Sequence, residues 1–128
     1  MPGMDTTPAP LAPIFLSHGS PMTALEPGAA GHFFQRLGPA LDATFGRPRA
    51  VLALSAHTLT RAPVLLAGAR HEAVYDFYGF PDELYRLRYD APGAPELAPR
   101  VQQLLRAAGI ESHTVDQGGL DHGIWTPL

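Results

Sequence analysis

The sequence predicts an α/β domain with a largely parallel central sheet flanked by helices. Short unbroken apolar runs, typical of strands buried on both faces, alternate along the chain with segments whose apolar residues recur at helical spacing. The chain has 128 residues, of which 45% are hydrophobic and 16% charged, enough for one packed domain. Such alternation is typical of parallel sheets covered by helices.

The first third of the chain predicts a leader, a strand and a helix. Residues 1–12, rich in Pro and Thr, are expected to form a flexible leader. Pro13–Leu16 is an apolar run that predicts the first buried strand. Gly31–Phe45 carries apolar side chains at helical spacing and predicts a helix, which Pro39 is expected to break or bend.

Two further strands and an irregular segment are expected in the middle of the chain. Ala50–Ser55 and Val64–Ala67 are short apolar runs that predict the second and third strands. Residues 70–95 are dense in aromatics, Gly and Pro, which favours a long irregular segment, with a helical turn starting near Asp82. Irregular segments of this length within compact domains are usually functional or disordered, and the aromatics argue against disorder.

The last third predicts one helix and one strand. Glu96–Ala108 has an apolar face at helical spacing, and Gly109 is suited to the left-handed conformation that ends a helix. Glu111–Val115 is expected to form the fourth strand.

Composition restricts the chemistry and the partners. The net charge of -3 offers no basic surface for nucleic acid or an anionic membrane. With no cysteine, disulfides, Fe–S clusters and cysteine-based zinc sites are excluded, and a metal would need His and carboxylate ligands. The N-terminal residues have no basic region and too short an apolar run for a signal peptide or membrane span, so a cytoplasmic location is expected.

Two of the predicted strands are followed by a serine and then a histidine. His18 lies in "LSHGS" after the first strand, and His57 lies in "LSAHT" after the second. Ligands bind at the carboxyl ends of parallel strands, so neighbouring strands would bring both imidazoles together. The pair indicates a metal or catalytic site, such as a non-haem Fe(II) centre with two histidines and one carboxylate, or structural histidines. The spacing does not distinguish iron from zinc.

A third histidine, His122, lies in "GLDHGIW" near the end of the chain. A neutral imidazole suits general acid/base work near pH 7, and a turn histidine bonded to the backbone is the alternative. The aromatic stretch Tyr75–Pro81, "YDFYGFP", is either a substrate-facing wall or a hydrophobic cluster under a loop.

Four motifs in this order, "LSHGSPM", "LSAHTLT", "VYDFYGFPDELYRLRYDAPGAP" and "GLDHGIWTPL", resemble the class III extradiol ring-cleavage dioxygenases of the LigB type. The similarity is greatest to their 4,5-DOPA dioxygenase-like branch. It covers residues 13–128, which correspond to the N-terminal half of the family's domain, so a truncated LigB-like fold is expected.

The resemblance implies a function and a role for each histidine. His18 and His57 would bind Fe(II), with zinc as the alternative metal, and His122 would be the active-site acid/base. Asp121 would orient His122 or a ligand. The substrates would be O₂ and a catechol such as DOPA or a related aromatic diol, which the family cleaves beside its hydroxyl groups.

The family's domain continues past the position of Leu128 and includes a further metal ligand. Asp76, Glu72, Asp116 and Asp121 are carboxylates that could substitute for it, although no family motif supports any of them. The chain is therefore expected to be a fragment, a relic, or a subunit whose other half comes from a partner chain, and exposed apolar surface would favour self-association. Two other functions stay open: a non-catalytic remnant or half-domain, and a zinc hydrolase built on His18, His57 and a carboxylate.

Overall fold

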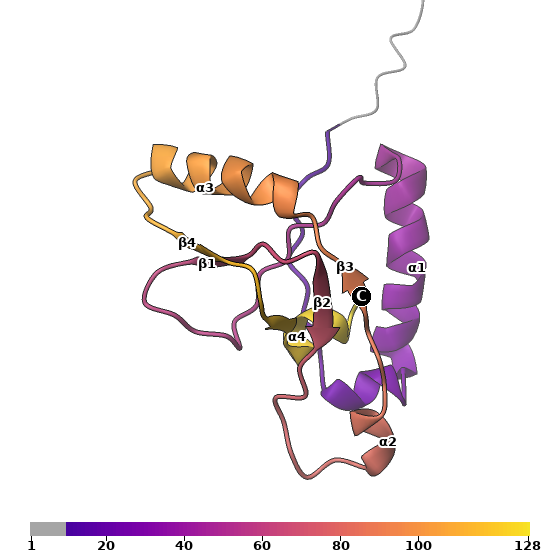
Figure 1. Ribbon diagram of the computed structural model, residues 1–128. Coiled ribbons are helices and arrows are strands. Elements are labelled where there is room, and N and C mark those ends of the chain that lie inside the picture. The colour runs from indigo at the N-terminus through magenta and orange to yellow at the C-terminus, as the bar shows by residue number, and fades with distance from the viewer. Residues whose placement is uncertain (1–9) are drawn as a thin grey trace, which may run out of the picture.

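A computed structural model describes residues 10–128 (Figure 1). The first nine residues of the expected leader lie outside the described part, and residues 10–12 are exposed and have no regular secondary structure. In the described part, no helix combines the length and the apolar character needed to cross a membrane.

The strands form two small sheets. In the first, β1 (Val64–Leu66) pairs in parallel with β4 (His113–Val115). In the second, β2 (Arg70–Ala73) pairs in parallel with β5 (Gly119–Leu120) and antiparallel with β3 (Ala91–Pro92). The expected α/β class with mainly parallel pairing is therefore confirmed, although the sheet is small and divided.

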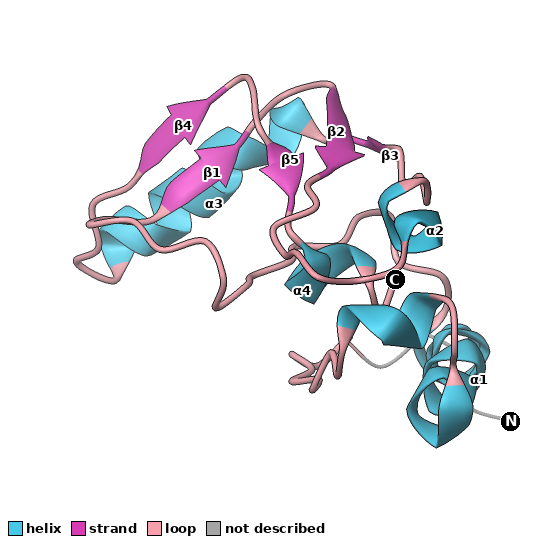
Figure 2. Cartoon of the chain, turned by 90° about the horizontal axis from the view of Figure 1, so that it is seen from below, coloured by secondary structure: helices cyan, strands magenta, loops and turns pink. Residues whose placement is uncertain are grey.

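The predicted C-terminal helix is confirmed. It begins with a short 3₁₀ turn, η2 (Pro95–Leu97), and continues as α3 (Ala98–Ala107). Figure 2 shows α3 lying alongside β1 and β4. Gly109 has a φ of 78°, the left-handed conformation expected after the last turn. The side-chain amide of Gln102 donates to the carbonyl oxygen of Ser112 at 3.1 Å, which ties the helix to the segment that leads into β4.

The N-terminal helix is longer than predicted. A 3₁₀ turn, η1 (Pro21–Ala24), precedes α1 (Gly28–Phe45). Pro39 lies inside α1 and does not break it, so the expected break is wrong. Proline removes one N–H and crowds the preceding turn, but its fixed φ is compatible with a helix, and the largely exposed α1 gives the turn room to adjust.

The aromatic segment is more ordered than its composition predicts, because it contains β2, β3 and α2 (Asp82–Tyr85), the last of which begins at the expected residue. Leu84 in α2 is fully buried, and Trp125 in α4 (His122–Trp125) is almost fully buried. The indole N–H of Trp125 donates to the carbonyl oxygen of Val74 at 2.9 Å. This bond joins α4 to the end of β2, and both lie at the centre of Figure 1.

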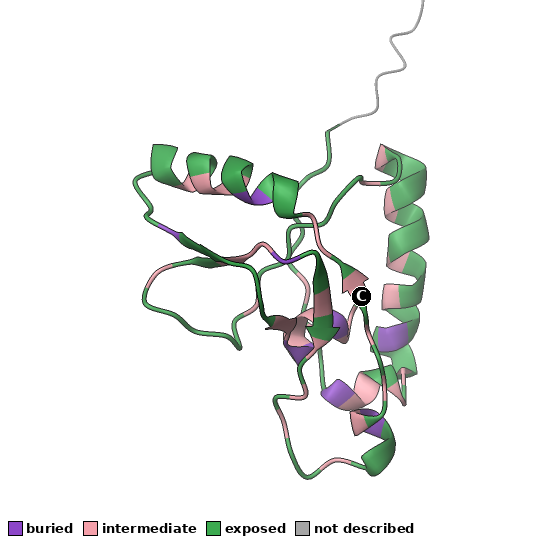
Figure 3. Ribbon diagram, viewed as in Figure 1, coloured by how far each residue is buried: buried purple, intermediate pink, exposed green. Residues whose placement is uncertain are grey.

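The first two predicted strands are wrong. Pro13–Leu16 and Ala50–Ser55 have no strand structure, and neither has a ladder partner among residues 10–128. Their side chains are not buried either, since Phe15 is 97% exposed and Leu54 is 86% exposed. The physical reason is that a strand requires hydrogen-bonded neighbours and a covering layer, and the described residues supply neither here. Figure 3 shows how much of the chain is exposed.

Candidate functional site

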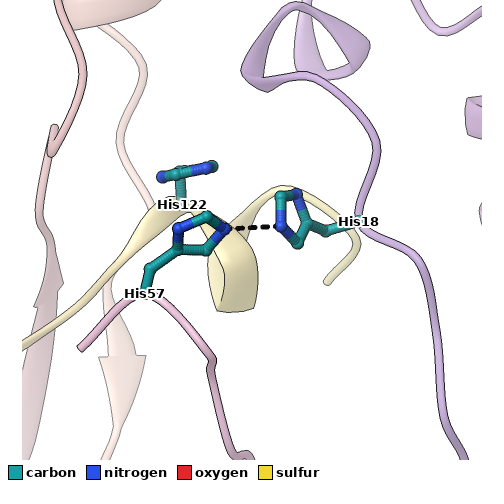
Figure 4. A group of neighbouring side chains, drawn as sticks. All are labelled: His18, His57 and His122. Atoms are coloured by element: carbon teal, nitrogen blue, oxygen red, sulfur yellow. Dashed lines mark hydrogen bonds between the residues drawn. The ribbon is translucent and has the colours of Figure 1, made fainter. Parts of the chain in front are cut away.

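Three histidines that are far apart in the sequence lie together: His18, His57 and His122 (Figure 4). The Nε2 atoms of His18 and His57 are 2.7 Å apart. The ring centroid of His122 lies 5.0 Å from that of His18 and 4.2 Å from that of His57. One nitrogen from each ring falls within 4.8 Å of the other two. The predicted proximity of His18 and His57 is thus confirmed, although both lie in loops and not at strand ends.

His18 lies at a bend in the chain before η1. The next residue, Gly19, has a φ of 69°, a conformation that other residues seldom adopt, and this turns the backbone after the histidine. The Ser20 hydroxyl then accepts a hydrogen bond from the backbone N–H of Met22 and caps η1. The Nδ1 atom of His18 is buried and has no hydrogen-bond partner within residues 10–128.

Asp121 holds the loop that carries His57. The carboxylate of Asp121 accepts hydrogen bonds at 2.7 Å from the hydroxyls of Ser55 and Thr58, which lie on either side of the histidine. The Ser55 oxygen in turn accepts the backbone N–H of His57 at 3.1 Å. Asp121 is only 4% exposed, and it also accepts the N–H of Gly123 and so caps α4. One buried carboxylate therefore joins the loop of His57 to the helix of His122.

His122 is held by a second carboxylate. The Oδ1 atom of Asp76 accepts hydrogen bonds from the backbone N–H of His122 at 3.0 Å and from its ring Nδ1 at 2.9 Å. Partial burial acts to raise the pKa of the Asp76 carboxyl, but the hydrogen bonds from His122 outweigh it and the pKa lies below its ordinary value. An ionised carboxylate only accepts hydrogen bonds, so Nδ1 of His122 is the donor in this pair.

The close approach of the two elements depends on Gly123. A Cβ atom at this position would lie 2.7 Å from the Ser55 hydroxyl and 2.8 Å from Cδ2 of His57. Both distances are shorter than van der Waals contact allows. Only glycine lets the loop of His57 lie this close to α4.

Aromatic rings pack beside the histidines. The ring of Phe77 meets that of His122 edge-on, with centroids 5.7 Å apart, and also packs against Phe80, Tyr85 and Trp125. The stretch Tyr75–Pro81 therefore forms the expected hydrophobic cluster, and one of its members, Phe77, borders the histidine group.

The three imidazoles suit a metal by their chemistry, with a small adjustment. Histidine nitrogens bind iron and zinc, and ligand nitrogens at ~2.1 Å from a metal lie about 3.0–3.4 Å from one another. The 2.7 Å between Nε2 of His18 and Nε2 of His57 is a hydrogen-bond distance, so the rings must separate by roughly 0.5 Å to share an ion. Both rings lie in loops, outside the helices and strands.

The carboxylates considered as an additional ligand do not join this group. Both oxygens of Asp121 and the Oδ1 atom of Asp76 face hydrogen-bond donors of the protein, and Glu72 and Asp116 instead border a separate shallow hollow beside β2 and β5. The role of Asp76 as the partner of His122 was missed from the sequence, because 46 residues separate the two. The sequence feature that indicates this role is a single carboxylate within an aromatic stretch, because a carboxylate among apolar side chains needs a hydrogen-bonding partner.

Residues 12–128 match the family described as the catalytic LigB subunit of aromatic ring-opening dioxygenase. The chain belongs to the LigB family. The predicted family resemblance is thereby confirmed, and the match includes all three histidines of the group.

Curated relatives of this LigB-family chain include 4,5-DOPA dioxygenase extradiol from Beta vulgaris, with 42% identity across 89% of the chain and 42% of the relative. The protein of the same name from Escherichia coli (strain K12) is 40% identical across 90% of the chain and 41% of the relative. Dioxygenase tasH of Hapsidospora irregularis is 39% identical across 92% of the chain and 39% of the relative. The chain thus spans about two fifths of the length of these relatives.

Proposed function

We propose that this chain is the N-terminal half of an extradiol dioxygenase that inserts both atoms of O₂ into a catechol, such as DOPA or a related aromatic diol. The observation that carries the proposal is the convergence of His18, His57 and His122 within a LigB-family chain. The names of the relatives support DOPA as the first substrate to test.

In this function His18 and His57 hold the metal, which is Fe(II), with zinc as the alternative. Bound Fe(II) would supply a Lewis acid and an electron donor toward O₂ and leave coordination positions for the substrates. His122 takes a proton from a catechol hydroxyl at its Nε2 atom and returns it later in the reaction. Phe77, at the edge of His122, offers an apolar surface that keeps water away from this proton transfer.

Asp121 contributes by orientation. It holds Ser55 and Thr58 on both sides of His57 and caps the helix that begins with His122. In the proposed enzyme it keeps the His57 imidazole at a fixed distance from His122, as outer partners of metal ligands commonly do.

Metal binding is the first test. Purified chain is dialysed against Fe(II) under anaerobic conditions, or against Zn²⁺, and its metal content is measured. We expect His57→Ala to lose most of the bound metal, whereas His32→Ala, which changes an exposed histidine outside the group, retains it. Equal metal content in the two variants would contradict the assignment of His57 as a ligand.

Ring cleavage is the second test. The Fe(II)-loaded chain is mixed with DOPA, and oxygen uptake is followed together with the absorbance of the semialdehyde product. We expect His122→Gln to abolish any catechol-dependent uptake without changing the metal content. Catechol-dependent uptake that survives this substitution would contradict the acid/base role of His122.

A second candidate function is a half-domain that acts only with a partner chain or a second copy. Large apolar side chains are exposed along the two extended segments that lead to the histidines, namely Leu11, Ile14, Phe15, Val51, Leu52 and Leu54. Exposed apolar side chains in this number favour association. If the chain binds metal, forms oligomers and shows no uptake with DOPA, this candidate is favoured.

A zinc hydrolase remains the third candidate, and the geometry disfavours it. The hydrolase would need a carboxylate as its third ligand, but both oxygens of Asp121 and Oδ1 of Asp76 are engaged by other protein groups, and the group in residues 10–128 that could hold a metal consists of three histidines. Hydrolysis of an activated ester by the Zn²⁺-loaded chain without oxygen uptake would favour it.

A further inference from the structure

We propose that Asp76 is a positioning residue that fixes both the ring orientation and the Nδ1–H tautomer of His122, so that Nε2 is the nitrogen that exchanges protons with the substrate. The part of this inference that concerns the substrate rests on the proposed dioxygenase function. The part that concerns the tautomer does not.

The geometry singles out one oxygen atom. Oδ1 of Asp76 accepts the ring Nδ1–H of His122 at 2.9 Å and also the backbone N–H of the same residue at 3.0 Å. The backbone N–H cannot change from donor to acceptor, so it holds Oδ1 at the start of α4. That oxygen then leaves Nδ1 of the ring no role except donor.

The surroundings restrict the ring further. His122 is only 8% exposed, and Phe77 meets it edge-on on one side while His57 lies on another. Rotation of the ring by half a turn would direct a carbon atom at Asp76 and leave a partly buried carboxylate without its ring partner, which is costly. Packing and hydrogen bonding therefore favour the same orientation.

The position of Asp76 explains why a carboxylate occurs in an aromatic stretch. Its neighbours Tyr75 and Phe77 pack into the cluster around Trp125, and this anchors the backbone from which Asp76 reaches His122. The same stretch thus supplies an apolar edge to the histidine group and the acceptor that orients its acid/base.

The tautomer is measured directly by NMR. The metal-free full chain is labelled with ¹⁵N, and long-range proton–nitrogen spectra are recorded at about pH 9, well above the ordinary titration range of histidine near ~6.5. The signals of His122 are assigned by their absence in His122→Gln. We expect a protonated Nδ1 and an unprotonated Nε2, and wild-type protein with a protonated Nε2 would overturn the proposal.

Variants at position 76 then test the cause. Asp76→Asn is expected to retain the wild-type tautomer, because the backbone N–H of His122 keeps the amide oxygen facing it. Asp76→Ala is expected to lose the tautomer preference and shift both nitrogen signals. Asp90→Ala, which removes an exposed carboxylate, is the matched control and should leave them unchanged.

Two outcomes would overturn the role of Asp76: unchanged nitrogen signals in a folded Asp76→Ala protein, or a protonated Nε2 in Asp76→Asn. If Asp76→Ala fails to fold, the wild-type and Asp76→Asn spectra still decide the matter. Catechol-dependent uptake that survives His122→Gln, together with the expected nitrogen signals, would count against the proposed acid/base function and support the positioning role.

Discussion

Replacement of Asp121 by alanine should both destabilise the chain and weaken metal binding. Asp121 is buried and accepts hydrogen bonds from two hydroxyls and from the backbone N–H of Gly123. Loss of the helix cap costs about 1 kcal/mol, and loss of each bond from a hydroxyl to the carboxylate about 1 kcal/mol more, since both hydroxyls can turn toward water. The free energy of unfolding should therefore fall by about 3 kcal/mol.

Urea denaturation followed by the fluorescence of the single Trp125 measures this loss. With an m value of ~2 kcal/mol/M, the midpoint should move by about 1.5 M toward lower urea. Asp121→Asn keeps an acceptor for the cap and should lose only about 1 kcal/mol. Calorimetric titration with Zn²⁺ should show weaker binding to Asp121→Ala than to Asp121→Asn. A midpoint for Asp121→Ala within 0.2 M of wild type, a margin of roughly the precision of such midpoints, would refute the reasoning.

Three further predictions follow from the same group of contacts. Gly123→Ala places a methyl group 2.8 Å from Cδ2 of His57, so Zn²⁺ affinity should fall at least about 10-fold in calorimetric titration; unchanged affinity would show that the loop moves freely. Because its folded-state pKa is lowered, Asp76 contributes stability that is present above about pH 4, near the ordinary Asp pKa of ~3.9, and is lost as the pH falls further. The urea midpoint of Asp76→Asn should therefore decline less than that of wild type between about pH 5 and about pH 3, and equal declines would contradict this. Trp125→Phe removes the bond to the Val74 carbonyl and should lower the thermal midpoint through a loss of about 1–2 kcal/mol, and a midpoint equal to that of wild type would show that the bond contributes nothing.

Several elements that the sequence predicts correctly have a pairing or packing partner within the described residues. Helix α3 has an apolar face at helical spacing and a glycine stop, and it forms where both features indicate. The strands Val64–Leu66 and His113–Val115 pair with each other and lie beside that helix. In each case the described residues provide the partner that the pattern requires.

The two wrong strands have the same apolar character and lack such partners. An apolar run indicates that a segment is suited to burial, but it does not indicate which segment covers it. Phe15 and Leu54 are exposed because no other described element lies over them. The chain spans about two fifths of its relatives' length, and strand pairing is a property of the residues on both sides of the ladder.

The candidate site was predictable at the level of residue type and only partly at the level of geometry. Serine–histidine motifs after apolar runs correctly indicated that His18 and His57 meet. The carboxylate of Asp76 was considered only as a metal ligand, because a contact across 46 residues leaves no periodic signal in a single sequence. Asp121 was expected to orient a neighbour, and its bonds to Ser55 and Thr58 are compatible with that proposed role.

Polar contacts link the loop of His57 to α4, and α4 is itself bonded to the end of β2 through Trp125. His18 and His57 both follow segments that have no ladder partner among residues 10–128, yet their Nε2 atoms lie 2.7 Å apart. Two carboxylates position two members of the group, His57 and His122: one joins the loop of His57 to α4, and the other joins α4 to the aromatic stretch. Each carboxylate bonds a backbone N–H of the first turn of α4, so this four-residue helix is the common support of the site. It follows that the geometry of the group depends more on Asp76 and Asp121 than on β1 and β4, whose pairing lies outside these contacts.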